Sequence, residues 1–355
     1  MIDCDIHPQI ADREELLSYI EPAQREWFRQ QVSSLGLPGY TYAHPQGWYR
    51  HDLEGELPGA TVAALRRELL DVFPIQVGVL NADDAVTLSL MGSPYRAAAL
   101  ARAHNEWIRE RWLDAEPRLR GAIVCPAQDP AAAATEIRRV AEDWRFIQVL
   151  LVGGAERPYG EPRYLPIFEA AAECGLPVAI HSGGEGMGIG APASAAGMPS
   201  FYIEWHTLGS SGSIMAHLVS LLCHGVFERF PTLNVLLLEG GVAWLPGILW
   251  RLDTNWRALR SETPWLEEKP SDVARERIRF STQPLEHTDG RDDLLFEMLE
   301  SVGAPDILCF ASDYPHWDFD DPAFMLKRLP QPWRDKVLHA NAADLYGSRL
   351  GLVPV

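Results

Sequence analysis

The chain alternates short apolar runs with longer stretches of helical periodicity. Eight runs rich in β-branched and other apolar residues have strand-like length, and they begin at Ile2, Ile75, Gly121, Phe146, Pro177, Asn234, Ile278 and Ile307. Apolar residues at helical spacing between most of them predict helices over Tyr95–Ala115, Pro130–Asp143, Tyr164–Cys174, Ser211–Phe230 and Asp292–Ser301. Strands that alternate with helices indicate a parallel sheet, and eight such units predict a closed (β/α)8 TIM barrel.

Two segments interrupt this rhythm. The first is an insertion over about residues 11–59, after the first strand, which is rich in aromatic residues, Pro and Gly. A loop of this length in a barrel is either a lid that takes part in binding or a flap without chemistry. The second, Gly183–Ser213, is dense in Gly, Ala and Ser and follows the fifth strand. Barrels of this size form one unit, so we expect a single domain over residues 1–355.

Charge narrows the choice of partners. The 355 residues include 49 acidic and 31 basic ones, which gives a formal net charge of -18. A chain this acidic repels nucleic acid and anionic membrane surfaces, so the expected partner is a small-molecule substrate. No apolar run approaches membrane-spanning length. The five cysteines form no C-x-x-C pair, and the chain opens directly on a strand, so we expect reduced thiols and a cytoplasmic location.

Polar residues stand at the C-terminal ends of five predicted strands. Alternate side chains of a barrel strand point inward, and the C-terminal face carries the active site in enzymes of this fold. Ionisable groups buried together need a partner of opposite charge, and a divalent cation is the simplest one. The residues at this face are Asp5, His7, His181, Glu239, Gln283 and Asp313.

Five segments carry a resemblance to a known family. They read IDCDIHP, EIRRVAEDWRF, LPIFEAAAECGLPVAIHSGG, GVFERFPTLNVLLLEGG and FASDYPHWD. The chain resembles the amidohydrolase-related (amidohydrolase 2) family, which includes aminocarboxymuconate-semialdehyde decarboxylase and the resorcylate-type decarboxylases. The resemblance implies a metal-dependent hydrolase-type barrel that binds one divalent ion (Zn, Mn or Fe) through Asp5, His7, His181 and Asp313. The opening Asp3-x-Asp5-x-His7 is similar to family members with a carboxylate in place of the first histidine.

The sixth strand departs from the family pattern. Members usually have a histidine followed by Gly at this point, whereas this chain reads Glu239-Gly240-Gly241. Glu239 is therefore a candidate base, metal ligand or hydrogen-bond acceptor for substrate. Its structural alternative is a buried carboxylate paired with Arg251. The missing imidazole could come from His206 or His316, and His316 is also a candidate catalytic residue.

Other residues are weaker candidates. We expect Asp3 to support the site by hydrogen bonding, and we expect no chemistry from His217 and His224. His44 and His51 lie in the long first loop. The candidate substrate-binding residues, each with ordinary packing or surface exposure as the alternative, are Arg50 as an anion clamp, Tyr202, Trp205, His206, Gln283 and Trp317.

Three functions fit these residues. The leading hypothesis is hydrolysis of an amide, ester, lactone or C–C bond by a metal-activated water, with Asp313 as general base and Glu239 assisting. The alternative is metal-dependent, non-oxidative decarboxylation of an aromatic or enol carboxylic acid. The second alternative is a catalytically silent barrel that binds a ligand. We also expect a homodimer, because the Ser211–Phe230 segment is strongly apolar.

Overall fold

Eight parallel strands follow one another around a single sheet in the computed structural model, which describes residues 1–30, 47–53, 55–83, 88, 91–186, 191–192, 197 and 199–352. The ring closes between its first strand and the segment that follows its last strand, where Cys4 N donates to Phe310 O over 3.0 Å and His7 N to Tyr314 O over 2.7 Å. The predicted TIM barrel is confirmed. Its strands are β1 (Ile2–Ile6), β2 (Val77–Leu80), β3 (Leu119–Val124), β4 (Phe146–Val152), β5 (Val178–His181), β6 (Val235–Leu238), β7 (Ile278–Ser281) and β8 (Leu308–Cys309).

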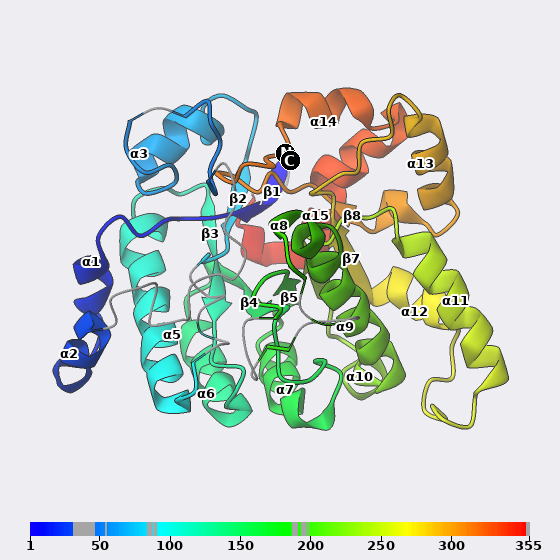
Figure 1. Cartoon of the computed structure of the whole chain (residues 1–355), viewed down its shortest axis with the longest axis horizontal. Helices are drawn as coiled ribbons and strands as arrows, with labels where there is room; N and C mark the ends of the chain where they lie inside the picture. The colour runs from blue at the N-terminus through cyan, green and yellow to red at the C-terminus, as the bar shows by residue number, and fades with distance from the viewer. Residues whose placement is uncertain are drawn as a thin grey trace.

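Helices surround this ring, as Figure 1 shows. The five predicted helices are present, although the segment predicted as Ser211–Phe230 is broken at Gly225, whose φ of 67° is left-handed. The α-helices are α1 (Arg13–Leu17), α2 (Pro22–Gln30), α3 (Val62–Leu65), α5 (Pro94–Ile108), α6 (Pro130–Val140), α7 (Leu165–Glu173), α8 (Tyr202–Glu204), α9 (Ser211–Cys223), α10 (Val226–Arg229), α11 (Leu245–Ala258), α12 (Pro270–Arg277), α13 (Asp292–Glu300), α14 (Pro322–Arg328) and α15 (Asn341–Tyr346). Wider π-helical turns continue α3 over Arg66–Leu70, α5 over Arg109–Leu113 and α8 over Trp205–Ser210, and another precedes α15 over Lys336–Ala340.

The strands are buried almost throughout, which accounts for their apolar runs. Polar side chains are nevertheless fully buried within the ring of strands, among them Asp3 and Asp5 on β1 and Gln148 on β4. Such groups are tolerated only when they are hydrogen-bonded or paired with charge. The interior of the barrel therefore depends on polar contacts, and these lead to the site described below.

The insertion after β1 is described only in part. Residues 11–30 include α1 and α2, while residues 31–46, which include His44, and residue 54 lie outside the described residues, so the lid remains a prediction. The end of the segment lies against the loop after β8. Tyr49 pairs with His316 in an antiparallel bridge, and Arg50 N donates to Pro315 O over 3.0 Å. This part of the insertion therefore borders the C-terminal face of the barrel.

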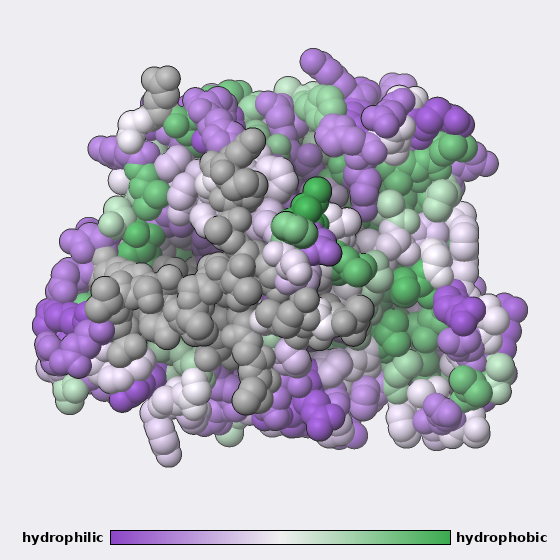
Figure 2. Space-filling model, in the orientation of Figure 1, coloured by the Kyte–Doolittle hydropathy of each residue, from purple (hydrophilic) through white to green (hydrophobic). Residues whose placement is uncertain are grey.

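The apolar residues of α9 serve the protein's own core. Ile214, Leu218 and Leu221 of this helix are buried, and no large apolar side chain of α9 is exposed. Met215 and Val219 of α9 are partly buried, so this helix offers little apolar surface for a dimer. Figure 2 shows hydrophobic surface elsewhere, on the right of the molecule where Figure 1 places α11 and α12, and in a smaller area near α8. Exposed members include Trp250 of α11 and Ile203 of α8. Homodimerisation remains a prediction.

None of the helices in the described part of the chain is long and apolar enough to cross a membrane.

The histidine of α9 yields a prediction about pH. His217 is buried, its Nε2 donates to Gly153 O over 2.8 Å, and its Nδ1 accepts from Tyr159 N over 3.2 Å. Burial lowers the pKa of His217 to about 4, whereas an unfolded histidine titrates near 6.5. Between these values the unfolded chain binds more protons, so the free energy of unfolding falls as the pH falls from 6.5 towards 4. His217→Gln removes this titration. In urea unfolding, the free energy of unfolding should fall between pH 7 and pH 5 by about 2 kcal/mol less in the variant than in the native protein. An equal loss in both proteins would contradict this assignment.

Candidate metal centre

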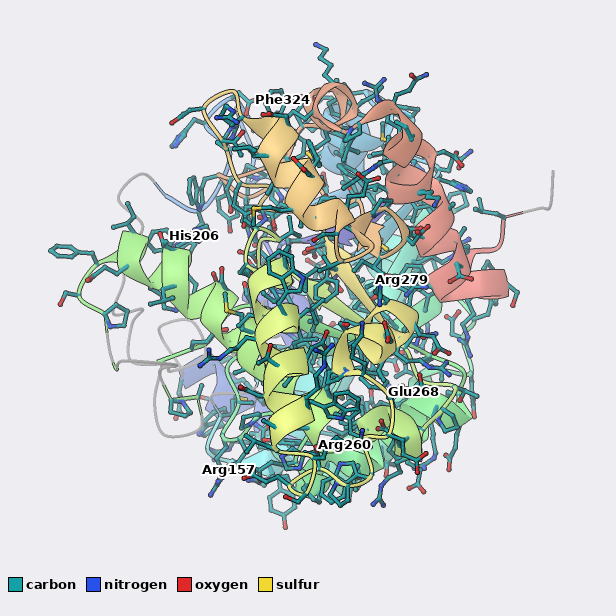
Figure 3. The ribbon with its side chains drawn as sticks, turned by 90° about the vertical axis from the view of Figure 1, so that its right-hand side faces the viewer. Arg157, His206, Arg260, Glu268, Arg279 and Phe324 are labelled. Carbon is teal, nitrogen blue, oxygen red and sulfur yellow. The ribbon has the colours of Figure 1, made fainter. Side chains whose placement is uncertain are left out.

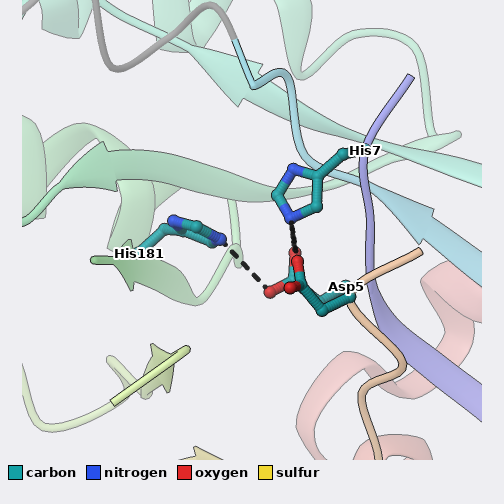
Figure 4. A group of neighbouring side chains, drawn as sticks. Asp5, His7 and His181 are labelled. Atoms are coloured by element: carbon teal, nitrogen blue, oxygen red, sulfur yellow. Dashed lines mark ion pairs between the residues drawn. The ribbon is translucent and has the colours of Figure 1, made fainter. Parts of the chain in front are cut away.

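Four side chains from three strands converge at the C-terminal mouth of the barrel. Asp5 lies in β1 and His7 just after it, His181 ends β5, and Asp313 follows β8. The potential ligand atoms of all four lie within 4.8 Å of one another, and all four residues are buried. His7 Nε2 is 3.2 Å from Asp5 Oδ1 and 2.9 Å from Asp313 Oδ1, and His181 Nε2 is 3.3 Å from Asp5 Oδ2. Figure 4 shows both imidazoles pointing at the Asp5 carboxylate. The structure thus brings together the four ligands that the family resemblance implied.

The potential ligand atoms of this group have lone pairs available for a metal ion. Asp5 Oδ2, His7 Nε2 and His181 Nε2 are buried and form no well-directed hydrogen bond with any part of the chain that the structure describes. The other nitrogen of each ring is engaged, since His7 Nδ1 lies 3.1 Å from Asn81 O and His181 Nδ1 lies 2.6 Å from Ser182 O. A proton on each Nδ1 leaves the Nε2 lone pairs facing the carboxylates, which is the arrangement that metal-binding histidines require.

The electrostatics of the group require positive charge. Burial opposes ionisation of Asp5, but the adjacent His181 and His7 outweigh it and hold the pKa of Asp5 well below its usual range. In the same way, burial is outweighed at Asp313 by His316 and His7, which lower its pKa to about 2. Against burial, the charge of Asp5 raises the pKa of His7 to about 10 and that of His181 to about 9. Protons on the imidazoles satisfy the two carboxylates, and a divalent cation would replace those protons with the same total charge.

Two backbone conformations aim side chains into this mouth. Asp313 and Glu239 have positive φ angles of 59° and 51°, values that are uncommon for residues other than glycine. Glu239 directly follows β6, and Asp313 lies in the loop that follows β8. Strained backbone of this kind is concentrated at functional sites, because the surrounding structure must hold it in place.

His316 and Gln283 contact Asp313 rather than standing apart from it. His316 Nδ1 lies 2.7 Å from Asp313 Oδ1, its Nε2 lies 3.6 Å from Asp83 Oδ2, and its ring stacks on His7 with centroids 4.5 Å apart. Gln283 Nε2 donates over 3.1 Å both to Asp313 Oδ2 and to Asp318 Oδ2. These two residues hold the carboxylate of Asp313 from opposite sides.

Glu239 belongs to the site and not to a surface ion pair. Its Oε2 lies 3.1 Å from His181 Nε2, whereas Arg251 is exposed, so the structure does not support the alternative pairing with Arg251. Burial, reinforced by the charge of Asp313 and opposed by His181, raises the pKa of Glu239 well above its usual value. His206 lies nearby and pairs with Asp318 over 3.2 Å, and potential ligand atoms of Glu239, His206 and Asp318 lie within 4.8 Å of one another.

Aromatic rings gather beside this second group. Tyr202 stacks on His206 with centroids 5.5 Å apart and accepts a hydrogen bond from Trp317 Nε1 over 3.2 Å, while His206 and Trp317 centroids are 5.2 Å apart. Figure 3 shows the segment that carries His206 projecting from the barrel. Trp205 is buried, with its indole N–H donated to Glu185 O, so it supports this wall from behind. These positions are compatible with the predicted substrate contacts.

Arg50 is already bound in this structure. Its guanidinium pairs with Asp52 and lies over the ring of Phe319 at 4.0 Å. An anion clamp at this position would therefore have to compete with the carboxylate of Asp52, and the role of Arg50 remains a prediction.

Sequence reasoning missed three polar residues around the site: Asn81, Asp83 and Asp318. Asn81 stands at the end of the second predicted strand, and the rule applied to the other strand ends would have found it. Asp83 and Asp318 lie in loops, where sequence spacing carries no such signal. Asp3 has the supporting role that was expected, because its Oδ1 accepts from Asp5 N over 3.2 Å and from Ser312 N over 3.0 Å.

Comparison with known proteins gives a consistent result. The amidohydrolase family model matches residues 2–348. A gamma-resorcylate decarboxylase from Rhodococcus jostii (strain RHA1) is 25% identical over 327 residues, which cover 83% of this chain and 94% of that protein. The crystal structure of a dihydroxybenzoic acid decarboxylase from Polaromonas sp. JS666, with bound manganese and the inhibitor 2-nitroresorcinol, is 19% identical with a TM-score of 0.66, covering 98% of this chain and 96% of that one. An amidohydrolase from Mycobacterium avium subsp. paratuberculosis K-10 is 19% identical with a TM-score of 0.73 and 98% coverage of both chains. The structural likenesses show the shared fold.

Loss of one ligand should empty the centre. We expect the native protein to bind about one divalent ion per chain and His181→Ala to retain little of it, because the remaining ligands cannot complete the coordination. The metal content is measured by inductively coupled plasma mass spectrometry after gel filtration in Mn²⁺-free buffer. His224→Ala is the matched control, since His224 is an exposed histidine at the end of α9. Equal metal content in the two variants would exclude His181 as a ligand.

Proposed function

Because the chain belongs to the amidohydrolase family, we propose that it is a metal-dependent, non-oxidative decarboxylase of an aromatic carboxylic acid, with the reaction centred on Asp5, His7, His181 and Asp313. Its curated relatives include the gamma-resorcylate decarboxylase described above, so the decarboxylation alternative has more support than the hydrolysis that the sequence favoured. The family and its enzyme relatives also argue against a silent barrel.

One observation carries this proposal. In the buried group of Asp5, His7, His181 and Asp313, the imidazole and carboxylate lone pairs face one another, and more carboxylates lie close by. Three further acidic residues, Glu239, Asp318 and Asp83, lie near Asp5 and Asp313 at the mouth of the barrel. A negatively charged substrate would be repelled by this group of carboxylates. A bound divalent cation supplies the positive charge that a carboxylate substrate needs here, and its ligands fit the two imidazoles and two carboxylates present.

The second feature in favour is the aromatic wall. Tyr202 and Trp317, together with the His206 ring, form it beside the ligand group on the loops after β5 and β8. Flat aromatic substrates pack against such rings in stacked or edge-on contact. Dihydroxybenzoates are the substrates named for relatives of the same fold, and we propose a hydroxylated benzoate as the substrate class.

The reaction also needs a proton at the ring carbon that loses its carboxylate. We assign delivery of this proton to Glu239, because it follows β6 at the mouth and already contacts His181. The proton adds to the ring carbon, the bond to the carboxylate carbon breaks, carbon dioxide leaves, and the bonding electron pair restores the aromatic ring. Glu239 is left as a carboxylate and regains its proton from water, with His206 and Asp318 as its polar neighbours.

A substrate panel tests this function. With Mn²⁺ present, hydroxylated benzoates should release carbon dioxide and give the corresponding phenols, while amides, esters and lactones should remain intact. Release of hydrolysis products without carbon dioxide would restore hydrolysis as the function.

A variant of Glu239 tests its role. Glu239→Gln preserves the shape of the side chain but carries no transferable proton, so kcat should fall by about 10²- to 10⁴-fold while metal content is unchanged. The matched control is Glu228→Gln, a change on the partly exposed α10 that should leave kcat as in the native protein. A Glu239→Gln variant that keeps native kcat would remove Glu239 from the proton transfer.

A further inference from the structure

We propose that Asn81, Gln148 and Tyr346 form a positioning chain that fixes the Asp5 carboxylate as a metal ligand from inside the barrel. The inference rests on the proposed function, because it assigns these residues a role in holding its metal. None of the three touches the other carboxylate ligand, Asp313, in the described structure, and together they connect the mouth of the barrel to α15.

The chain is a continuous series of hydrogen bonds through buried space. Asn81 Nδ2 donates to Asp5 Oδ1 over 2.7 Å, Gln148 Nε2 donates to Asn81 Oδ1 over 2.8 Å, and Tyr346 Oη donates to Gln148 Oε1 over 2.7 Å. Asp5, Asn81 and Gln148 are completely buried, and Tyr346 is nearly so. The residues come from β1, the end of β2, β4 and α15, so only the closed barrel brings them together.

The direction of every bond follows from the Asp5 end. An ionised carboxylate and the carbonyl of Cys4 can only accept, and Asn81 Nδ2 lies 2.7 Å from Asp5 Oδ1 and 3.0 Å from Cys4 O. The amide of Asn81 must therefore turn its oxygen to Gln148, and Gln148 must in turn present its oxygen to Tyr346. Burial, with the nearby Cys4 and Cys309, raises the pKa of Tyr346 well above its usual value, so its hydroxyl remains a donor. Each member has one orientation that satisfies its neighbours.

Asn81 holds two ligands at once. Its side chain binds Asp5, while its backbone carbonyl lies 3.1 Å from His7 Nδ1. The first contact leaves Asp5 Oδ2 without a directed hydrogen bond in the described structure, and the second keeps the lone pair of His7 Nε2 at the centre. Asn81, just after β2, thus orients both Asp5 on β1 and His7 just after that strand.

A neutral chain suits this role better than a cation would. Asp5 and Asp313 together carry two negative charges, which match one divalent ion. A lysine or arginine beside Asp5 would orient the carboxylate. Its positive charge would also repel the metal ion and neutralise part of the negative charge of Asp5. Amide and hydroxyl donors fix the carboxylate without reducing the charge available to the ion. Partners of this kind typically change metal affinity by about 10- to 100-fold when they are removed.

The test measures Mn²⁺ affinity without substrate, by titration calorimetry in competition with a chelator. Asn81→Leu keeps the size of the side chain and removes its hydrogen bonds, and it should weaken Mn²⁺ binding by about 10- to 100-fold. Tyr346→Phe removes only the hydroxyl at the far end of the chain, and it should weaken binding by about tenfold, the lower end of that range. The apparent melting temperature of each metal-free variant is recorded alongside.

Asn105→Leu is the matched control. Asn105 is also completely buried, and its amide donates to a strand carbonyl, Val124 O, and to a carboxylate, Glu136 Oε1. It lies on α5 and touches none of the four ligands. This variant should melt at a lower temperature than the native protein but bind Mn²⁺ with native affinity, which separates positioning from general loss of stability.

The outcomes are distinct. Native-like Mn²⁺ affinity in Tyr346→Phe and Asn81→Leu, or an equal loss in Asn105→Leu, would overturn the positioning chain and leave the proposed function standing. Failure of the native protein to bind Mn²⁺ or any other divalent ion would overturn both. Should Asn81→Leu not fold, Tyr346→Phe decides the question, because it removes a single oxygen atom.

Discussion

The need of two buried carboxylates for positive charge governs this structure. Asp5 and Asp313 are fully buried at the mouth of the barrel, in a medium where an uncompensated charge is prohibitive. His7 lies within 3.2 Å of one and 2.9 Å of the other, and its raised pKa reflects that demand. Protons on the imidazoles or a divalent ion can meet it. The positions of His181, Gln283 and His316 follow from the same constraint, since each contacts one of the two carboxylates.

The closing seam of the barrel makes this arrangement possible. Asp5 lies on β1 and Asp313 in the segment that follows β8, and Asp313 N donates to Asp5 O over 3.1 Å, so one backbone contact sets the spacing of the two carboxylates. Asp3, one pleat deeper, binds Ser312 N and fixes the turn that gives Asp313 its left-handed backbone. The spacing of these candidate ligands is thus a consequence of the backbone contacts that close the barrel.

We propose that residues below the candidate ligands set the affinity for the metal ion, whereas residues above them take part in the reaction. Below the ligands, neutral groups from β2, β4 and α15 hold Asp5 from inside the barrel. Above them, the segments after β5, β6 and β8 carry Glu239, His206 and the aromatic wall, which we propose face the substrate. Glu239, which stands in place of the usual family histidine, borders both layers, because its Oε2 lies 3.1 Å from His181 Nε2. In the proposed mechanism, the candidate metal ligands are those of the family resemblance while the residue that donates the proton differs.

Hydrophobic periodicity acts over a few neighbouring residues, so the amino-acid sequence was enough to predict the eight strands, the main helices and the polar residues at strand ends. It also pointed to Asp5, His7, His181 and Asp313 through motifs of the family. Which polar groups meet depends on the folded barrel. Asp3 and Ser312 are 309 residues apart, and Glu239 faces His181 rather than Arg251. Asn81, Asp83 and Asp318 acquired their contacts in the same way, because closure of the ring joins strand ends that no local pattern relates.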